Sequence, residues 1–218
     1  MLADFALRVA RRPRGKELAI CDVGAGCGVV GLVLLRALAQ ARLTAVELQP
    51  RLAAIARRNL DDNGLGDRGE VLELDVASAQ AKRQLPGARF DWVVCNPPYQ
   101  AVGRGAHNPS GELAIARHEL RLPLGRLCDE LRRVLRPRGQ AALVFPAARL
   151  AELLAATSAV GLAPTRLRLC HPRAGRPATR ALVLCEKGGP GGRLQVEAPL
   201  HERDERGLAT DEARRIAG

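Results

Sequence analysis

A candidate catalytic group closes one apolar run of the chain and consists of Asn96, Pro97, Pro98 and Tyr99. The run itself, residues 90–95, is typical of a buried parallel strand, and it stops here because proline cannot donate a ladder hydrogen bond. Pro98 also restricts the backbone of Pro97, so the Pro97 carbonyl is held stiffly beside the side-chain carbonyl of Asn96. These two acceptors could take both N–H protons of an exocyclic amine while Tyr99 stacks on its ring, a contact worth about 1–3 kcal/mol for a nucleobase. The alternative is an ordinary tight turn, in which Asn and Pro are common.

A glycine-rich segment follows the first predicted strand, residues 18–23, and precedes an apolar helix that we expect to run to about residue 40. A strand, a glycine loop and a helix in this order are typical of nucleotide-binding α/β folds. The loop residues that we expect to approach a cofactor are Gly24, Ala25, Gly26 and Gly28. A plain strand-to-helix turn would explain the glycines without any ligand.

Two acidic residues indicate which cofactor this loop accepts. Gly26, Gly28 and Gly31 fit the dinucleotide pattern, and Glu47, at the end of the next predicted strand, lies where a ribose-binding acid belongs. Asp22, at the end of the first strand, disfavours NAD because its carboxylate would repel a pyrophosphate at the helix N-terminus. S-adenosylmethionine carries no phosphate and has a cationic ammonium that Asp22 would attract, while Glu47 can accept from both ribose hydroxyls. The pattern therefore favours S-adenosylmethionine, although Glu47 by itself could be a solvated strand end.

The end of the third predicted strand, residues 69–74, supplies two further candidates. Asp75 could accept a hydrogen bond from the adenine amino group of the cofactor, and Val76 could pack on the adenine ring. Asp75 could equally be the N-cap of a helix that begins near Ala77, since Asp is a favoured N-cap residue. Both roles stay open.

The charge of the chain favours a polyanionic partner. Its 34 Lys and Arg residues outnumber 23 Asp and Glu residues, which gives a net charge of +11 over 218 residues. Nucleic acid or an acidic membrane surface suits that balance. Residues 153–185 contain no acid, and a glycine-rich loop at residues 100–111 follows Tyr99. The residues that we expect to contact RNA in these two stretches are Arg168, His171, Arg173, Arg176 and Arg104. An exposed turn in an arginine-biased protein is the alternative.

Six cysteines contain no Cys-x-x-Cys pair and lie mostly in apolar runs, which favours small core residues over a zinc site or disulfides. No signal peptide precedes them, and no apolar stretch is long enough to span a bilayer. We therefore expect a reduced, cytoplasmic protein with no metal and no membrane partner. The sequence carries no signal for the oligomeric state, and a monomer is the default expectation.

The motifs together resemble a known family. Asp22-Val-Gly-Ala-Gly-Cys-Gly, Glu47, Asp75 and Asn96-Pro-Pro-Tyr resemble the class I S-adenosylmethionine-dependent methyltransferases that act on amino nitrogens. A closer resemblance, over roughly residues 1–200, is to the tRNA1(Val) adenine-N6-methyltransferase family. It rests on Gly103, Asn108-Pro109, Ala116-Arg117-His118-Glu119, Leu127-Cys128, Val144-Phe145-Pro146-Ala147 and His171-Pro172-Arg173.

The resemblance implies a fold and a reaction. The fold is α/β, a Rossmann-like class I methyltransferase with a seven-stranded, mostly parallel sheet and helices on both faces. The reaction moves a methyl group from S-adenosylmethionine to the exocyclic N6 of an adenine in tRNA, the base beside the anticodon of a valine tRNA. The alternatives are methylation of guanine N2 in rRNA or of a protein glutamine, and a non-catalytic RNA-binding protein with a degenerate cofactor site.

Composition divides the chain. Residues 1–187 form the expected methyltransferase domain, and residues 188–218 form a Gly/Pro-punctuated charged tail that we expect to be partly ordered. Members of the family carry a further segment before the position of Met1 that helps close over the cofactor, and this chain begins within it. Either an upstream start precedes Met1 or part of the cofactor lid is absent.

Overall fold

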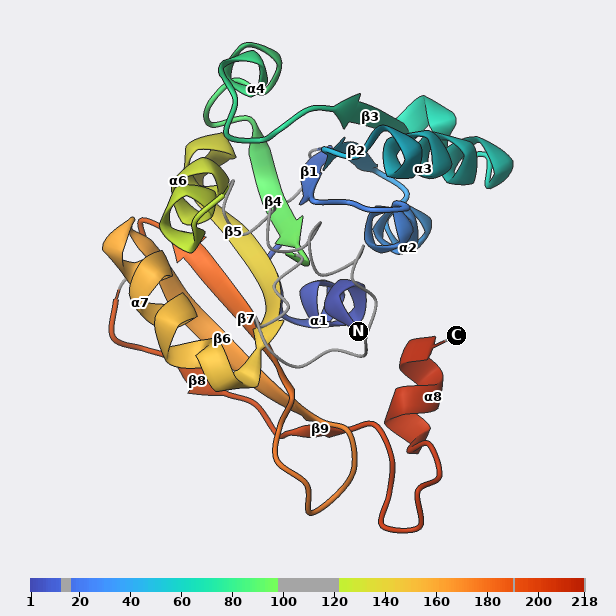
Figure 1. The fold of residues 1–218 in the computed structure, drawn as a ribbon, viewed down its shortest axis with the longest axis vertical. Helices are drawn as coiled ribbons and strands as arrows, with labels where there is room; N and C mark the ends of the chain where they lie inside the picture. The colour runs from blue at the N-terminus through green and yellow to red at the C-terminus, as the bar shows by residue number, and fades with distance from the viewer. Residues whose placement is uncertain (13–16, 98–121, 190, 218) are drawn as a thin grey trace, which may run out of the picture.

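The computed structural model describes residues 1–12, 17–97, 122–189 and 191–217. One mixed sheet lies between two layers of helices (Figure 1). Its strands are β1 (Leu18–Val23), β2 (Ala41–Glu47), β3 (Gly69–Glu73), β4 (Phe90–Cys95), β5 (Leu135–Pro146), β6 (Leu162–His171), β7 (Arg180–Lys187), β8 (Gln195–Val196) and β9 (Leu200–His201). The helices are α1 (Leu2–Val9), α2 (Val29–Ala37), α3 (Pro50–Asp62), α4 (Ala79–Gln84), α6 (Leu124–Val134), α7 (Leu150–Ala159) and α8 (Asp211–Ala217), with 3-10 turns at Gly66–Arg68 and Ala147–Arg149.

The sheet has the order β3-β2-β1-β4-β5-β7-β6-β8, with β9 also on β6. Strands β1 to β5 pair in parallel, and β7 runs antiparallel between β5 and β6. The strand order reverses between β1 and β4, so the loops after these two strands diverge and leave a crevice at their carboxyl ends. The expected mostly parallel sheet with helices on both faces is confirmed, with two short strands beyond the expected seven.

Each face of the sheet buries its own apolar cluster. One cluster joins α4, α6 and α7 to the sheet, and the other joins α1, α2 and the end of α3. Helix α1 contributes Phe5, which is fully buried, and Trp92 of β4 fixes the chain after α1 by donating from Nε1 to the Arg11 carbonyl at 2.7 Å. The sequence therefore folds as the alternation of buried strands and amphipathic helices predicts.

The segment Arg136–Gly139 contains a proline and a glycine, which are typical of a helix end followed by a turn. It belongs to β5, which starts at Leu135. The register passes from Phe90 opposite Leu135 to Trp92 opposite Gln140, so the extra residues of β5 form a bulge. Arg136 bonds to Asp91 there at 2.9 Å, which anchors the bulge to β4.

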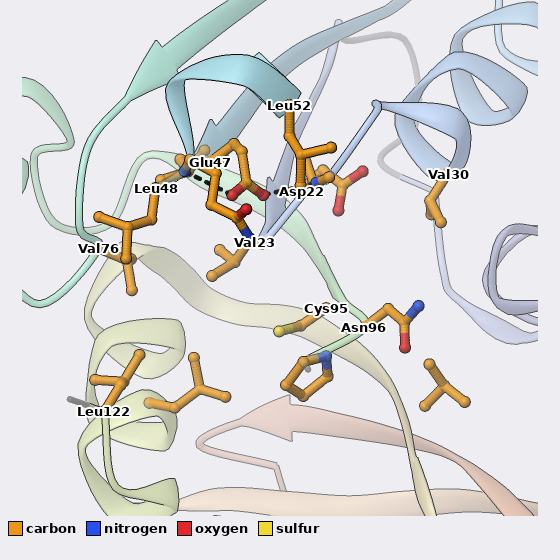
Figure 2. A pocket seen from close by; sticks show the side chains of 18 of the residues that line it. Asp22, Val23, Val30, Glu47, Leu48, Leu52, Val76, Cys95, Asn96 and Leu122 are labelled. Carbon is orange, nitrogen blue, oxygen red and sulfur yellow. Dashed lines mark hydrogen bonds between the residues drawn. The ribbon is translucent and has the colours of Figure 1, made fainter. Parts of the chain in front are cut away.

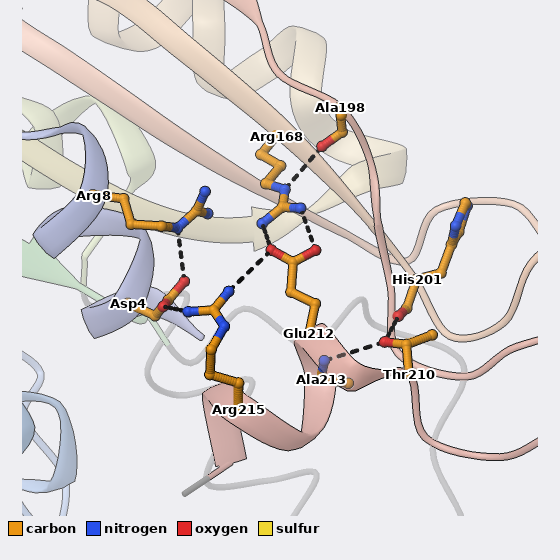
Figure 3. A network of polar contacts seen from close by, with 9 residues as sticks. All are labelled: Asp4, Arg8, Arg168, Ala198, His201, Thr210, Glu212, Ala213 and Arg215. Atoms are coloured by element: carbon orange, nitrogen blue, oxygen red, sulfur yellow. Dashed lines mark hydrogen bonds and ion pairs between the residues drawn. The ribbon is translucent and has the colours of Figure 1, made fainter.

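The C-terminal segment returns to the sheet. Strands β8 and β9 pair with β6, and α8 lies beside α1 (Figure 3). Arg168 of β6 donates two hydrogen bonds to the Glu212 carboxylate of α8, both at 2.8 Å, and a third to the Ala198 carbonyl at 2.9 Å. Arg215 of α8 reaches Asp4 of α1 at 3.4 Å. The described part of residues 188–218 is thus attached to the domain by strand pairing and ion pairs.

Arg168 is buried, whereas the predicted contact with RNA requires an exposed side chain. It is 5% exposed and donates three hydrogen bonds, two to Glu212 and one to Ala198. A guanidinium engaged in this way is not presented to a phosphate, so the predicted RNA contact of Arg168 is wrong. Its physical role is to hold α8 against the sheet.

Candidate active site

A pocket of about 660 Å³ lies at the carboxyl ends of β1, β2 and β4 (Figure 2). Its walls come from the glycine loop after β1, the ends of β2 and β3, and the residues after β4. This is the switch point of the sheet, where ligands of open α/β folds bind. The volume falls within the range of small-molecule and cofactor sites.

The glycine loop follows a path that needs glycine at several positions. Gly24, Gly26 and Gly28 have φ values of +70°, +58° and +81°, a region that residues with a Cβ rarely adopt. The Gly24 and Ala25 amides donate to the Val46 carbonyl at 2.9 and 3.0 Å, which binds the loop to β2. Gly24, Ala25 and Gly26 line the pocket, whereas Gly28 begins α2 and packs against Ala56.

Glu47 is held at the pocket wall by backbone amides. Its Oε2 accepts from the Gly26 amide and its Oε1 from the Gln49 amide, both at 2.8 Å. The side chain is 5% exposed. These bonds fix both carboxylate oxygens, each of which keeps a second lone pair for a hydroxyl donor in the pocket.

Asp22 is a buried acid on the same wall. It is 2% exposed, and its Oδ2 accepts from the Gly31 amide at 3.1 Å. Loss of solvation raises the pKa of Asp22 from 3.8 to about 7, with the Gly31 bond opposing the shift and the charge of Glu47 adding to it. A cation in the pocket would stabilise the Asp22 carboxylate, so this site suits a positively charged ligand group.

Asp75 and Val76 also line the pocket. Asp75 Oδ1 accepts from the Ala77 amide at 2.9 Å, so Asp75 forms a local turn. The N-cap of α4 is Ser78, whose hydroxyl accepts from Ala81, and the helix begins at Ala79. The alternative that Asp75 caps this helix is therefore wrong, and its place at the pocket wall leaves the cofactor role as a proposal.

Asn96 lies on the opposite side of the pocket from Glu47 (Figure 2), and Pro97 also lines the pocket. Asn96 is exposed and follows directly on buried Cys95 at the end of β4. Asn96 and Pro97, which carry the two predicted acceptors, therefore line the same pocket as Asp22 and Glu47. Pro98, Tyr99 and Arg104 lie outside the described residues.

Sequence reasoning missed several residues of this pocket. Val144, Phe145 and Pro146 line it from the end of β5, and Arg180 lines it from the start of β7. They converge because Pro146 and Arg180 are direct partners across the β5–β7 ladder. The signal available in the sequence was an apolar run, residues 141–145, that ends at Pro146.

The remaining predicted RNA contacts lie on the connection between β6 and β7. Arg173 and Arg176 are exposed, and His171 Nδ1 is 2.6 Å from the Arg176 carbonyl. The His171 ring also meets the His201 ring edge to face, with centroids 5.2 Å apart. These three residues sit at the same edge of the sheet as the pocket.

Other site classes find no support in the described residues. No group of three His, Cys, Asp or Glu side chains there could hold a metal ion. All six cysteines are free and five are buried, and burial raises the pKa of the Cys128 thiol to about 12 and that of Cys170 to about 11. Across the same described residues, no helix combines the length and apolarity needed to cross a bilayer.

The known proteins that resemble this chain are methyltransferases, which agrees with the pocket described above. The family described as the methyltransferase small domain matches residues 7–121, more than half of the chain. A protein of Aeromonas hydrophila named tRNA1(Val) (adenine(37)-N6)-methyltransferase is 32% identical over 186 residues, 85% of this chain and 75% of that protein. The chain therefore belongs to the methyltransferase small domain family.

A second relative and one solved structure are also similar to this chain. A Porphyromonas gingivalis protein of the same name is 32% identical over 146 residues, 67% of this chain. This chain spans only 56% of the length of that relative. A solved structure from Agrobacterium tumefaciens, described as a predicted O-methyltransferase, superposes with a TM-score of 0.74 at 28% identity, covering 95% of this chain and 90% of that one.

Proposed function

We propose that this protein transfers a methyl group from S-adenosylmethionine to the exocyclic N6 of an adenine in tRNA. The observation that carries the proposal is that one pocket joins a buried acid, Asp22, to an acceptor corner, Asn96 and Pro97. One end suits a cationic cofactor, and the other suits a flat amine.

The residues present fit S-adenosylmethionine. The Asp22 carboxylate would face the ammonium of its methionine end, and Glu47 would accept from its ribose hydroxyls. Asp75 and Val76 would hold the adenine by its amino group and its face. When bound, the cofactor supplies a methyl group already activated on a sulfonium.

The corner at the end of β4 would prepare the nucleophile. An adenine amino nitrogen is a poor nucleophile because its lone pair is delocalised into the ring. Hydrogen bonds from its two N–H groups to Asn96 Oδ1 and to the Pro97 carbonyl would favour a tetrahedral nitrogen and free that lone pair. On methyl transfer, N6 would release one proton to solvent and the cofactor would be left as S-adenosylhomocysteine. Catalysis then rests on positioning and directed hydrogen bonds, with Tyr99 as the stacking partner and no strong general base.

The substrate is inferred from charge and from the names of the relatives. Those names specify adenine 37 of a valine tRNA for those proteins. A base in an anticodon loop can be splayed out at modest cost, and a net charge of +11 suits tRNA. The Agrobacterium protein is described as acting on oxygen, but paired acceptors at Asn96 and Pro97 favour an NH2 group here.

The test uses tRNA from a strain that lacks the gene. Incubation with this protein and S-adenosylmethionine, followed by digestion and mass spectrometry, should restore N6-methyladenosine in valine tRNA. Appearance of N2-methylguanosine instead, or of methylated protein glutamine in a parallel incubation, would overturn the assignment. A protein that binds tRNA but shows no calorimetric binding of S-adenosylmethionine would favour a non-catalytic role.

A further inference from the structure

The pocket is divided by charge. Asp22, Glu47 and Asp75 supply acids from the β1, β2 and β3 ends. Of the described residues that line the pocket, Arg180 alone is positively charged. The strand order β2-β1-β4-β5-β7 places Asn96 between the acids and Arg180 along the sheet edge. A ligand that extends beyond the Asn96 corner, away from the cofactor, therefore meets a cation.

Arg180 is held in place but not enclosed. It is the first residue of β7, opposite Pro146 of β5 and Cys170 of β6, and its side chain is 46% exposed. Its Nη2 pairs with Glu202. The Glu202 backbone is fixed in turn, because its amide donates to the His171 carbonyl at 2.9 Å and its carbonyl accepts from Thr210 at 3.1 Å.

The ion pair with Glu202 leaves most of the guanidinium donors available. A guanidinium carries five N–H donors, and a partly exposed pair of this kind contributes little to stability. A phosphate could bind the free edge in a bidentate manner while Glu202 keeps the side chain oriented. Exposed Arg173 and Arg176 on the connection between β6 and β7 add charge of the same sign at this edge.

We propose that Arg180 binds the phosphate next to the methylated base and so selects a nucleotide within a polyanionic chain as substrate. This inference rests on the proposed function and names a contact within the same site. It excludes a neutral glutamine side chain as the preferred acceptor, since that substrate presents no anion to Arg180.

A chemical double-mutant cycle tests the contact. Anticodon stem-loops with single neutral methylphosphonates, placed in turn at each phosphate around the target adenine, are bound to wild type and to Arg180→Gln and followed by fluorescence anisotropy. We expect Arg180→Gln to weaken binding of unmodified RNA about tenfold, the range for a charged hydrogen bond. At one methylphosphonate position, wild type and variant should bind equally. A constant ratio at every position would overturn the proposal.

Three controls separate the contact from a structural effect. Glu202→Gln removes the negative charge but keeps a side-chain oxygen that can accept from Arg180, so it should bind RNA as well as wild type or better. An equal loss in Glu202→Gln and Arg180→Gln would overturn the proposal, because the pair would then act only structurally. Arg193→Gln, an exposed arginine on the C-terminal segment, should leave binding unchanged. Calorimetric affinity for S-adenosylmethionine should be equal in wild type and Arg180→Gln.

Binding and methyl transfer distinguish this inference from the proposed function. A positional cycle with no methyl transfer by wild type would refute the function and leave the contact standing. Methyl transfer to adenine, with no phosphate position coupled to Arg180, would support the function and refute the contact.

Discussion

Asn96 is the residue on which the proposed chemistry depends. It stands at the end of β4, exposed to the pocket, and its backbone continues from the buried Cys95. The acceptor geometry therefore derives from a core strand and not from a free loop. Rigid support of this kind is what a directed hydrogen bond needs.

Asn96→Ala should keep cofactor binding and lose turnover by about 100-fold or more, by analogy with the loss of one aimed hydrogen bond in another active site. Single-turnover kinetics and calorimetry with S-adenosylmethionine measure the two effects separately. Asn63→Ala is the matched control, because Asn63 is exposed at the end of α3 and its side chain donates to the Asn59 carbonyl, four residues earlier. Wild-type turnover by Asn96→Ala would end the mechanism.

Asp22 gives the cofactor site a pH dependence. Burial raises its pKa to about 7, so a cation must displace a proton to bind below that pH. We expect calorimetric affinity for S-adenosylmethionine to be about tenfold weaker at pH 6 than at pH 8, as linkage requires for one proton. In Asp22→Asn the affinity should be lower and nearly flat over this range. A wild-type profile equally flat would contradict the assignment of Asp22 to the ammonium.

The same pKa sets the sign of a stability effect. The unfolded chain releases the Asp22 proton near its usual pKa of 3.8, whereas the folded protein without ligand holds it to about 7. The free protein therefore loses stability from this group as pH rises through that interval. Thermal unfolding should show Asp22→Asn gaining more over wild type at pH 8 than at pH 4. An equal difference at both pH values would show that Asp22 stays charged in the free protein.

At the scale of elements, helix α2 packs closely against β2, and this packing positions the glycine loop at the pocket wall. A Cβ added to Gly31 of α2 would lie 2.4 Å from Leu43 Cδ2 of β2, and Leu43 is 3% exposed. The third glycine of the dinucleotide-like pattern thus serves helix–sheet packing.

Gly31→Ala should reduce the free energy of unfolding by about 1–3 kcal/mol through overpacking, despite its better helix propensity. Gly125→Ala in α6 is the control, since no atom of the described residues is found within 4 Å of its added Cβ, and it should stabilise the protein by up to about 1 kcal/mol. Urea denaturation measures both. A stabilised Gly31→Ala would show that α2 packs less tightly than described.

At the scale of the whole molecule, α8 joins the two ends of the chain. Arg168 is buried, Glu212 is 32% exposed at its side chain, and Arg215 extends the network to Asp4 of α1 (Figure 3). Hydrogen bonding to Arg168 lowers the pKa of Glu212, so its contribution to stability is present at neutral pH and is lost as pH falls through that lowered pKa.

Glu212→Gln should cost about 1–3 kcal/mol, because it leaves Arg168 buried with a weaker partner, and partial exposure of Glu212 keeps the cost below that of a fully buried pair. Glu205→Gln, on an exposed turn, should change stability by less than about 0.5 kcal/mol. Thermal unfolding and limited proteolysis of the C-terminal segment report the difference. Equal protease resistance and equal Tm in both variants would contradict the described role of α8.

Local pattern determined much of this protein. Strands at residues 18–23 and 90–95 have the predicted bounds, since their apolar runs end at an acid-glycine turn and at proline, which act within a few residues. Pocket positions of Asp22, Glu47 and Asn96 followed as well, because the carboxyl ends of parallel strands must share one edge. Only the tertiary structure decided which arginines are exposed and which line the pocket. Glu212, distant in sequence, pairs with Arg168 and helps bury it, whereas strand pairing between β5 and β7 places Arg180 at the pocket. Exposure of a strand residue depends on which remote segment packs on its face, and no local pattern encodes that.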